Sequence, residues 1–231
     1  MKKQSLFIVP VAAIAAVFSG CSKSSSSAPP TTANVMFVNG CAAGATAITL
    51  SADNNGVALP GASSLNFLAY SGYQSITAGS GIALSFQIKG LSGLDTGVET
   101  LAIGSNYSAF AGGSITSAPF VFTSDDLTAP SSGNAKVRFI NLSPDNQAMD
   151  CYLGAVKVDS GVAYLSCTPF IETPAASSEK IEMLEHAYPQ FSALISAQTL
   201  SAGRIYTFMY TGESAVTTGA SVLTLTAITN K

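Results

Sequence analysis

The segment that most constrains the fold is a strand-like run at residues 135–145, Ala-Lys-Val-Arg-Phe-Ile-Asn-Leu-Ser-Pro-Asp. Val137 and Phe139 fall on one side of an extended chain and Arg138 on the other, which is the period of two expected of a half-buried β-strand. Pro144 then ends the strand, because proline has no N–H to donate and presets a turn. The segment therefore predicts a strand that runs into a tight turn.

Residues 34–40, Asn-Val-Met-Phe-Val-Asn-Gly, repeat this pattern earlier in the chain. Four positions of the two segments coincide: Val35 with Val137, Phe37 with Phe139, Val38 with Ile140 and Asn39 with Asn141. Further along, Ile181 and Met183 are expected to take the places of Ile82 and Leu84. The chain is therefore predicted to contain two copies of one β unit.

Turn residues recur at intervals of roughly ten residues through both copies, and no stretch shows a sustained helical period, which favours an all-β sandwich. Each copy is close to the ~100 residues of an immunoglobulin-like sandwich, so we expect two tandem immunoglobulin-like β-sandwich modules. The expected divisions are a lipoprotein signal peptide at 1–20, a flexible tether at 21–33, a first module at 34–130, a linker at 131–134 and a second module at 135–231.

The start of the chain has the layout of an export signal. Lys2 and Lys3 precede an apolar run at residues 6–18, which is too short to span a bilayer in the mature protein. Phe-Ser-Gly then precedes Cys21, which resembles the lipobox of bacterial lipoproteins, in which the cysteine is acylated and anchors the protein in a membrane. Ser22 rather than aspartate follows, and by this resemblance the outer membrane is favoured. An ordinary secretory signal with a chance cysteine is the alternative.

Charged residues make up only 10% of the chain, against about a quarter in average proteins. The apolar content of 47% is too high for a disordered chain. Ten basic residues stand against thirteen acidic ones, and they are scattered, so the chain lacks the electrostatic footprint of a nucleic-acid-binding protein. We expect no nucleic-acid partner and no cofactor.

Four stretches of the second copy form a recognisable set. They are Val-Arg-Phe-Ile-Asn-Leu-Ser-Pro-Asp at 137–145, Met-Asp-Cys-Tyr-Leu at 149–153, Gly-Val-Ala-Tyr at 161–164 and Gly-Arg-Ile-Tyr-Thr at 203–207. Together they resemble the DUF4397 family, which the first copy matches more loosely because Gly-Cys-Ala-Ala stands at 40–43 in place of Ser-Pro-Asp. The resemblance implies an exported, lipid-anchored bacterial protein of unassigned function, and it transfers no catalytic residue.

Residue sets that could support catalysis or bind metal are sparse. His186 is the only histidine and could serve as the base of a Ser–His–acid site, but no Gly-x-Ser-x-Gly elbow accompanies it. Asp125 with Asp126, and Asp145 with Asp150, are candidate calcium ligands, although carboxylates in such places more often cap turns. Thirteen acidic residues do not select one carboxylate pair for glycoside hydrolysis.

Three cysteines remain beside the lipidated Cys21, namely Cys41, Cys151 and Cys167. Export leads to an oxidising compartment, where disulfides persist. A disulfide between Cys151 and Cys167 is favoured because both lie in the second copy, while the other pairings and free thiols remain open.

Two aromatic residues, Tyr70 and Tyr73, could face a ligand and form a sugar-binding platform together with Phe67. Alternating aromatic residues on strands are more often part of a core, and we prefer that interpretation. The expected function is that of a lipid-anchored protein of the bacterial cell envelope with a non-catalytic role in binding, adhesion or scaffolding. The alternatives are a glycan-binding component of an envelope uptake system and a hydrolase with an unrecognised site. Its modules would face either the periplasm or the cell surface, with a glycan or an envelope protein as partner.

Overall fold

The computed structural model describes residues 31–42, 49–55, 57–88, 93–113, 119–145, 148–187, 192–214 and 222–231. The predicted signal peptide and Cys21 lie outside these residues. The described part is built from β-strands and one short 3-10 helix, η1 (Pro60–Ala62), and it contains no helix long and apolar enough to cross a bilayer. The prediction of an all-β sandwich is confirmed, whereas the immunoglobulin-like assignment stays a prediction.

Residues 32–124 form two sheets, which we call module 1. Its inner sheet has the order β5 (Tyr70–Thr77), β1 (Thr32–Asn39), β8 (Asn106–Ala111) and β9 (Phe120–Ser124). Its outer sheet has the order β3 (Val57–Ala58), β2 (Thr49–Asn54), β6 (Gly79–Ile88) and β7 (Gly93–Leu101), with β4 (Leu65–Asn66) also paired to β2.

Residues 134–229 form two further sheets, which we call module 2. Its inner sheet has the order β13 (Ser166–Cys167), β10 (Asn134–Asn141), β17 (Ile205–Thr211) and β18 (Thr224–Thr229), with β14 (Ile171–Pro174) also paired to β10. Its outer sheet has the order β12 (Val156–Val162), β11 (Met149–Leu153), β15 (Ala176–Glu185) and β16 (Ser192–Leu200).

The two modules share one strand order and matching registers. β1 runs parallel to β8 in module 1, and β10 runs parallel to β17 in module 2. Leu68 and Leu165 both adopt a left-handed backbone, with φ of 68° and 62°, and their N–H groups donate to the carbonyl oxygens of Asn39 and Asn141. Because a non-glycine residue is seldom found at positive φ, this shared detail supports the predicted internal repeat.

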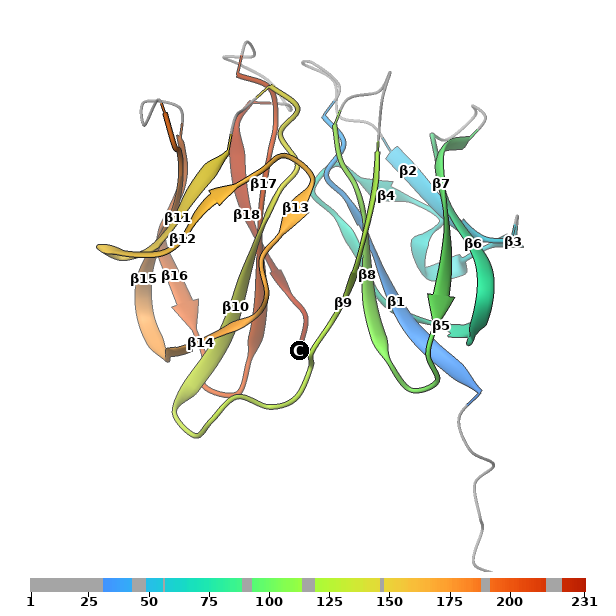
Figure 1. Cartoon of the computed structure of the whole chain (residues 1–231), viewed down its shortest axis with the longest axis horizontal. Helices are drawn as coiled ribbons and strands as arrows, with labels where there is room; N and C mark the ends of the chain where they lie inside the picture. The colour runs from blue at the N-terminus through green and yellow to red at the C-terminus, as the bar shows by residue number, and fades with distance from the viewer. Residues whose placement is uncertain are drawn as a thin grey trace, which may run out of the picture.

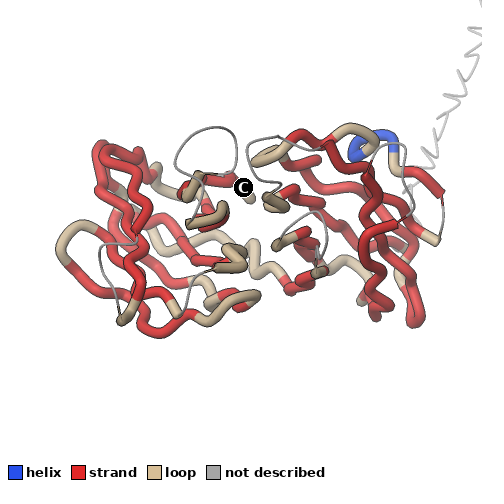
Figure 2. The backbone as a smooth tube through the Cα atoms, turned by 90° about the horizontal axis from the view of Figure 1, so that it is seen from above, coloured by secondary structure: helices blue, strands red, loops and turns tan. Residues whose placement is uncertain are grey.

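The inner sheets of the two modules face each other in the middle of the molecule, and the outer sheets lie on its two flanks (Figure 1). Seen from above, the modules lie side by side (Figure 2). Each sandwich encloses its own apolar core, and a third apolar cluster, the junction core, draws on both inner sheets. Its buried members are Met36, Val38 and Phe110 from module 1 and Ile140, Leu142, Met209 and Ile228 from module 2.

The strands β1 and β10 differ from the half-buried strands that their period of two suggests, because both faces of each strand are covered. Val137 and Phe139 point into the core of module 2, as expected. Arg138 points the other way and is nevertheless 2% exposed, because the inner sheet of module 1 covers that face. The sequence period identifies the strand correctly, but it cannot show that a second module covers the polar side.

Candidate functional site

The strand ends of the two modules approach closely at one side of the junction core. A Cβ atom on Gly40 would lie 2.6 Å from the Leu142 Cδ1 atom, so only glycine fits there without a shift of the neighbouring module. The Thr211 hydroxyl donates a hydrogen bond of 2.5 Å to the Gly40 carbonyl oxygen, and the Gly113 N–H donates one of 3.3 Å to the Leu142 carbonyl oxygen. The modules are therefore joined by polar contacts as well as by apolar packing.

A buried ion pair crosses the middle of the junction. The Arg138 Nη1 atom lies 2.7 Å from the Asp125 Oδ1 atom, and the two side chains are 2% and 0% exposed. The Arg138 Nε–H donates to the Thr207 hydroxyl at 2.9 Å, and its Nη2 donates to the Ser108 hydroxyl at 3.2 Å. The guanidinium carbon also lies 4.3 Å from the centroid of the Phe170 ring. A buried charge is tolerated only when it is paired and hydrogen-bonded in this way.

The hydrogen bonds around this ion pair close into a ring. The Tyr73 hydroxyl donates to the Asp125 Oδ2 atom at 2.5 Å and accepts from the Asn230 amide at 3.2 Å. The Thr207 hydroxyl donates to the Asn230 side-chain oxygen at 2.7 Å and accepts from Arg138, which completes the ring. Burial, together with the Asp125 charge, raises the pKa of Tyr73, so its hydroxyl stays protonated and keeps its role as donor.

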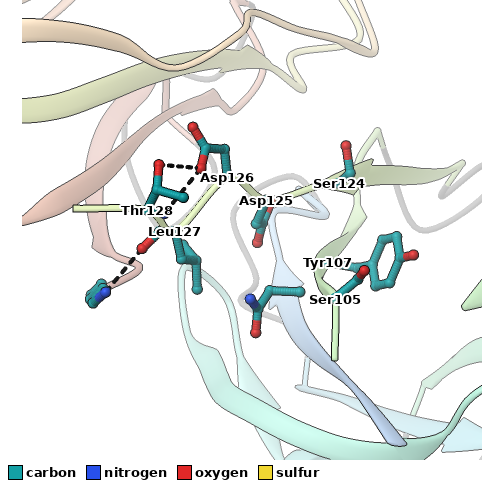
Figure 3. A pocket seen from close by; sticks show the side chains of 9 residues that line it. Ser105, Tyr107, Ser124, Asp125, Asp126, Leu127 and Thr128 are labelled. Atoms are coloured by element: carbon teal, nitrogen blue, oxygen red, sulfur yellow. Dashed lines mark hydrogen bonds between the residues drawn. The ribbon is translucent and has the colours of Figure 1, made fainter. Parts of the chain in front are cut away.

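An open cleft of about 630 Å³ lies beside this ring (Figure 3). It is lined by Ser105, Asn106, Tyr107, Ser124, Asp125, Asp126, Leu127, Thr128 and Lys231. Hydrogen bonds from Lys136 and Thr128 hold the pKa of Asp126 below its usual range, and its carboxylate lies 2.8 Å from the Lys136 Nζ atom. Because Asp125 is likewise paired with Arg138, the cleft presents hydroxyl and amide groups rather than unpaired carboxylates. We call it the junction cleft.

Tyr73 is not available for the aromatic platform that was considered as the alternative to core packing. Tyr73 belongs to the buried ring, because its hydroxyl requires a partner inside the junction and finds Asp125. Tyr70 is 39% exposed, and Phe67 is half-buried. The preferred interpretation, that these aromatic residues serve packing, therefore holds for Tyr73.

His186 contacts Asp150, one of the residues considered as a calcium ligand. Its Nδ1 atom lies 2.8 Å from the Asp150 Oδ1 atom, and the Ser160 hydroxyl donates to the same oxygen at 2.7 Å. Burial raises the pKa of Asp150, but hydrogen bonds from Lys157, Ser160 and His186 outweigh it and lower the pKa below its usual range. In a Ser–His–acid site the imidazole lies between the hydroxyl and the acid, whereas here the Asp150 carboxylate lies between the Ser160 hydroxyl and the His186 imidazole. This arrangement therefore organises the β11–β12 hairpin and does not activate Ser160.

The candidate calcium ligands are occupied by groups of the protein itself. Asp125 and Asp126 bind Arg138 and Lys136, and the Asp145 carboxylate accepts the Ser214 N–H at 3.0 Å. Across the ranges that the structure describes, no cluster of three or more histidine, cysteine or acidic side chains is arranged to hold a metal ion.

The favoured disulfide between Cys151 and Cys167 does not form in the structure, which has Cys41, Cys151 and Cys167 as free thiols. Cys151 belongs to the core of module 2, while Cys167 packs against the junction core, so the inner sheet separates them. Burial, with a smaller contribution from the Glu213 charge, raises the pKa of Cys41 to about 12, which keeps it in the unreactive thiol form.

The residue that sequence reasoning missed is the partner of Arg138. Asp125 was assigned to a turn, yet its carboxylate is fully buried against the guanidinium. A signal was present, because an arginine within an apolar strand of a chain with 10% charged residues calls for a buried acidic partner.

Comparison with known proteins gives one family and no curated relative. A family model described as "Domain of unknown function (DUF4397)" matches residues 33–152, which include module 1 except its first residue, together with β10 and most of β11. We expected the second copy to carry the closer resemblance, but the match covers only its opening. No curated protein matches the chain.

Among solved structures, the chain is similar to the crystal structure of CBMbc, a family CBM26 module of Eubacterium rectale Amy13K in complex with maltoheptaose. The identity is 8%, and the alignment covers 84% of this chain and 96% of that chain with a TM-score of 0.25. A similarity at this level carries no argument about what this chain binds.

Proposed function

This chain belongs to the DUF4397 family, and from that premise we propose that it is a lipid-anchored cell-envelope protein with a non-catalytic role in binding, adhesion or scaffolding. The observation that carries the proposal is the junction. Modules joined only by a linker are expected to move relative to each other, unless a large apolar interface holds them. Here an apolar cluster and a buried ion pair join them, so the two modules present their outer surfaces in a fixed relative orientation.

Lipid anchoring rests on the sequence around Cys21, and the first described strand begins at Thr32, which leaves a short tether between the acylated cysteine and the fold. Replacement of Cys21 by alanine should abolish labelling with a fatty-acid analogue and release the protein from membranes. Cys41→Ala is the matched control, because Cys41 is fully buried and should leave labelling unchanged. Labelling that survives in the Cys21→Ala variant would refute the assignment.

The proposed outer-membrane location is tested by protease treatment of intact cells and of lysed cells, followed by fractionation of the membranes. Cleavage in intact cells would place the modules on the surface, where the role would be adhesion or extracellular binding. Protection before lysis and cleavage afterwards would place them in the periplasm and favour scaffolding. Recovery with inner-membrane vesicles would contradict the outer-membrane proposal.

A glycan-binding role is the second candidate, and the junction cleft favours it. Hydroxyl and amide groups line this cleft, both of its aspartates are paired internally, and the Lys231 ammonium donates to the Leu127 carbonyl oxygen. These neutral groups suit a polyhydroxylated ligand without charge. On a glycan array, Ser124→Tyr should remove binding because the ring fills the cleft. Ser177→Tyr, on an exposed position of β15, should leave binding intact. Absence of binding by the unchanged protein, or equal binding by both variants, would exclude this candidate.

A further inference from the structure

A second groove lies far along the chain from the junction cleft, in module 2, between the β11–β12 hairpin and the β14–β15 connection. Its volume is about 470 Å³, within the range of small-molecule sites. Leu153, Val156, Val158 and Pro174 supply apolar walls, and Val156 is 64% exposed. Glu179 adds one carboxylate, so the groove combines an apolar lining with a single acidic group.

Module 1 shows why this groove exists. In the inner sheets, Ala33 of module 1 pairs with Ile76, and the equivalent Ala135 of module 2 pairs with Thr173. Thr173 therefore stands at the position of Ile76, which is only 2% exposed. The outer sheets can be compared in the same way, because Asn54 pairs with Leu84 in module 1 and Leu153 pairs with Ile181 in module 2. Two residues earlier on each strand, Glu179 takes the position of Ile82, which packs on the core of module 1. Module 2 thus has smaller or polar side chains where module 1 has two isoleucines.

Module 1 also packs the short helix η1 against β2 and β5, and its Ala62 is fully buried in the core of that module. In module 2 the corresponding residues continue as the strand β12, because Asp150 holds that strand through the Ser160 hydroxyl and the Gly161 N–H. At this corner module 2 therefore lacks the two isoleucines of module 1, and it has a strand where module 1 has the short helix.

Glu179 is half-buried, and its carboxylate has no hydrogen bond or ion pair with the described residues. Two basic side chains of the same outer sheet have other partners, since Lys180 binds Glu182 and Lys157 binds Asp150. Gly154 leaves room for the carboxylate, because a Cβ atom there would lie 2.8 Å from the Glu179 Oε1 atom. An uncommitted carboxylate above apolar walls selects a ligand that has a positive charge and an apolar body.

We propose that this groove binds a small aliphatic ammonium compound, with the ammonium group on Glu179 and the carbon chain on Val156, Val158 and Pro174. Burial of the chain supplies affinity, and the carboxylate supplies the preference for a cation. The groove shares no lining residue with the junction cleft. The proposal therefore does not depend on what the cleft binds or on the envelope function.

The test compares three probes with the same six-carbon body, namely hexylammonium, hexanol and hexanoate, by NMR titration of the valine methyl groups of the purified protein. Hexylammonium should bind most tightly and hexanoate most weakly. Glu179→Gln should weaken hexylammonium binding about tenfold and leave hexanol unchanged, because it removes the charge and keeps the shape. Glu182→Gln is the control and should change neither probe.

A second variant tests the groove itself. Thr173→Ile restores the residue of module 1, so it should fill the groove and weaken both hexylammonium and hexanol without unfolding the protein. Equal affinity for hexanoate, an unchanged affinity in the Glu179→Gln or Thr173→Ile variant, or no binding of hexylammonium would each overturn the proposal.

Discussion

The two modules present equivalent positions to the junction with different chemistry. The matching registers of their inner sheets give these equivalent pairs: Met36 and Arg138, Ser108 and Thr207, Tyr73 and Phe170, and Asp125 and Asn230. Module 2 supplies the base of the buried ion pair, and its counterpart in module 1 is the neutral Met36. The acid, Asp125, directly follows the last strand of module 1, and its counterpart directly after the last strand of module 2 is the neutral Asn230.

This asymmetry favours the pairing of unlike modules. If two copies of module 1 met through their inner sheets, two Asp125 carboxylates would be buried without a base, and two copies of module 2 would likewise bury two Arg138 side chains. An unpaired buried charge costs several kcal/mol, whereas the pairing found here neutralises both charges. The ion pair therefore specifies which surfaces meet, and the apolar core supplies the attraction.

The largest effect is expected from Arg138→Met, which gives module 2 the residue of module 1. Asp125 would stay buried without its base, and loss of one partner of a buried pair costs about 3–5 kcal/mol. Urea denaturation measures the change in the free energy of unfolding. Met36→Leu is the control at the equivalent position and should cost less than about 1.5 kcal/mol. A loss below about 1 kcal/mol in Arg138→Met would show that the pair contributes little to the junction.

The double variant Asp125→Asn/Arg138→Met should recover most of that loss, because no charge is left unpaired. We expect its free energy of unfolding to lie within about 1 kcal/mol of the unchanged protein, since neutral replacements of buried ion pairs are often tolerated. The complete double-mutant cycle, with Asp125→Asn alone as the fourth member, measures the coupling. Additive losses in the two single variants would refute the interpretation of an ion pair.

The same double variant also tests pairing specificity. With Met at position 138 and Asn at position 125, the four equivalent positions of the ion pair, 36 and 138 together with 125 and 230, become neutral and alike, so this charge no longer penalises pairing between like modules of two chains. Analytical ultracentrifugation after refolding at high concentration should show dimers in the double variant and fewer in the unchanged protein. A monomeric double variant would mean that shape, rather than charge, specifies the junction.

A smaller effect is expected from Tyr73→Phe, which gives module 1 the aromatic residue that module 2 has in Phe170. The substitution keeps the aromatic ring but removes the hydroxyl between Asp125 and Asn230, and loss of a hydrogen bond to a charged group costs about 1.5–3 kcal/mol. Tyr107→Phe is the control, because among the residues that the structure describes its hydroxyl accepts the Ala102 N–H and contacts no charged group. An equal loss of stability in both variants would show that the hydrogen-bonded ring around the ion pair contributes no more than an ordinary tyrosine hydrogen bond.

Much of the fold could be predicted from the sequence, because the repeated strand pattern identifies the strands and their duplication. The register within the second copy could not. Ile181 occupies the place of Leu84 and Met183 that of Phe86, two residues away from the expected alignment. A β-strand repeats its faces every two residues, so a shift by two keeps every apolar side chain on the correct face and leaves no trace in the pattern.

The candidate site was harder to predict, because it depends on how the modules meet. The sequence shows Arg138 on the opposite side from Val137 and Phe139, but the same alternation describes a solvated arginine equally well. Only the contact between the inner sheets makes it a buried charge and gives Asp125 its role. Local patterns predict strands, whereas a site assembled from two modules requires their relative placement.

The smallest effect on stability is expected in the β11–β12 hairpin, where the outer sheets of the two modules differ. Asp150 holds β12 in module 2, where module 1 has η1, and its pKa is lowered in the folded state by hydrogen bonds that outweigh the effect of burial. Its contribution to stability is therefore present above the ordinary aspartate pKa of about 3.9 and is lost as the pH falls toward the lowered value. In urea denaturation between about pH 5 and pH 2, Asp150→Asn should show a shallower loss of stability than the unchanged protein. Asp159→Asn, on β12, is the control and should keep the slope of the unchanged protein. An unchanged slope in Asp150→Asn would mean that the hairpin is held by its backbone alone.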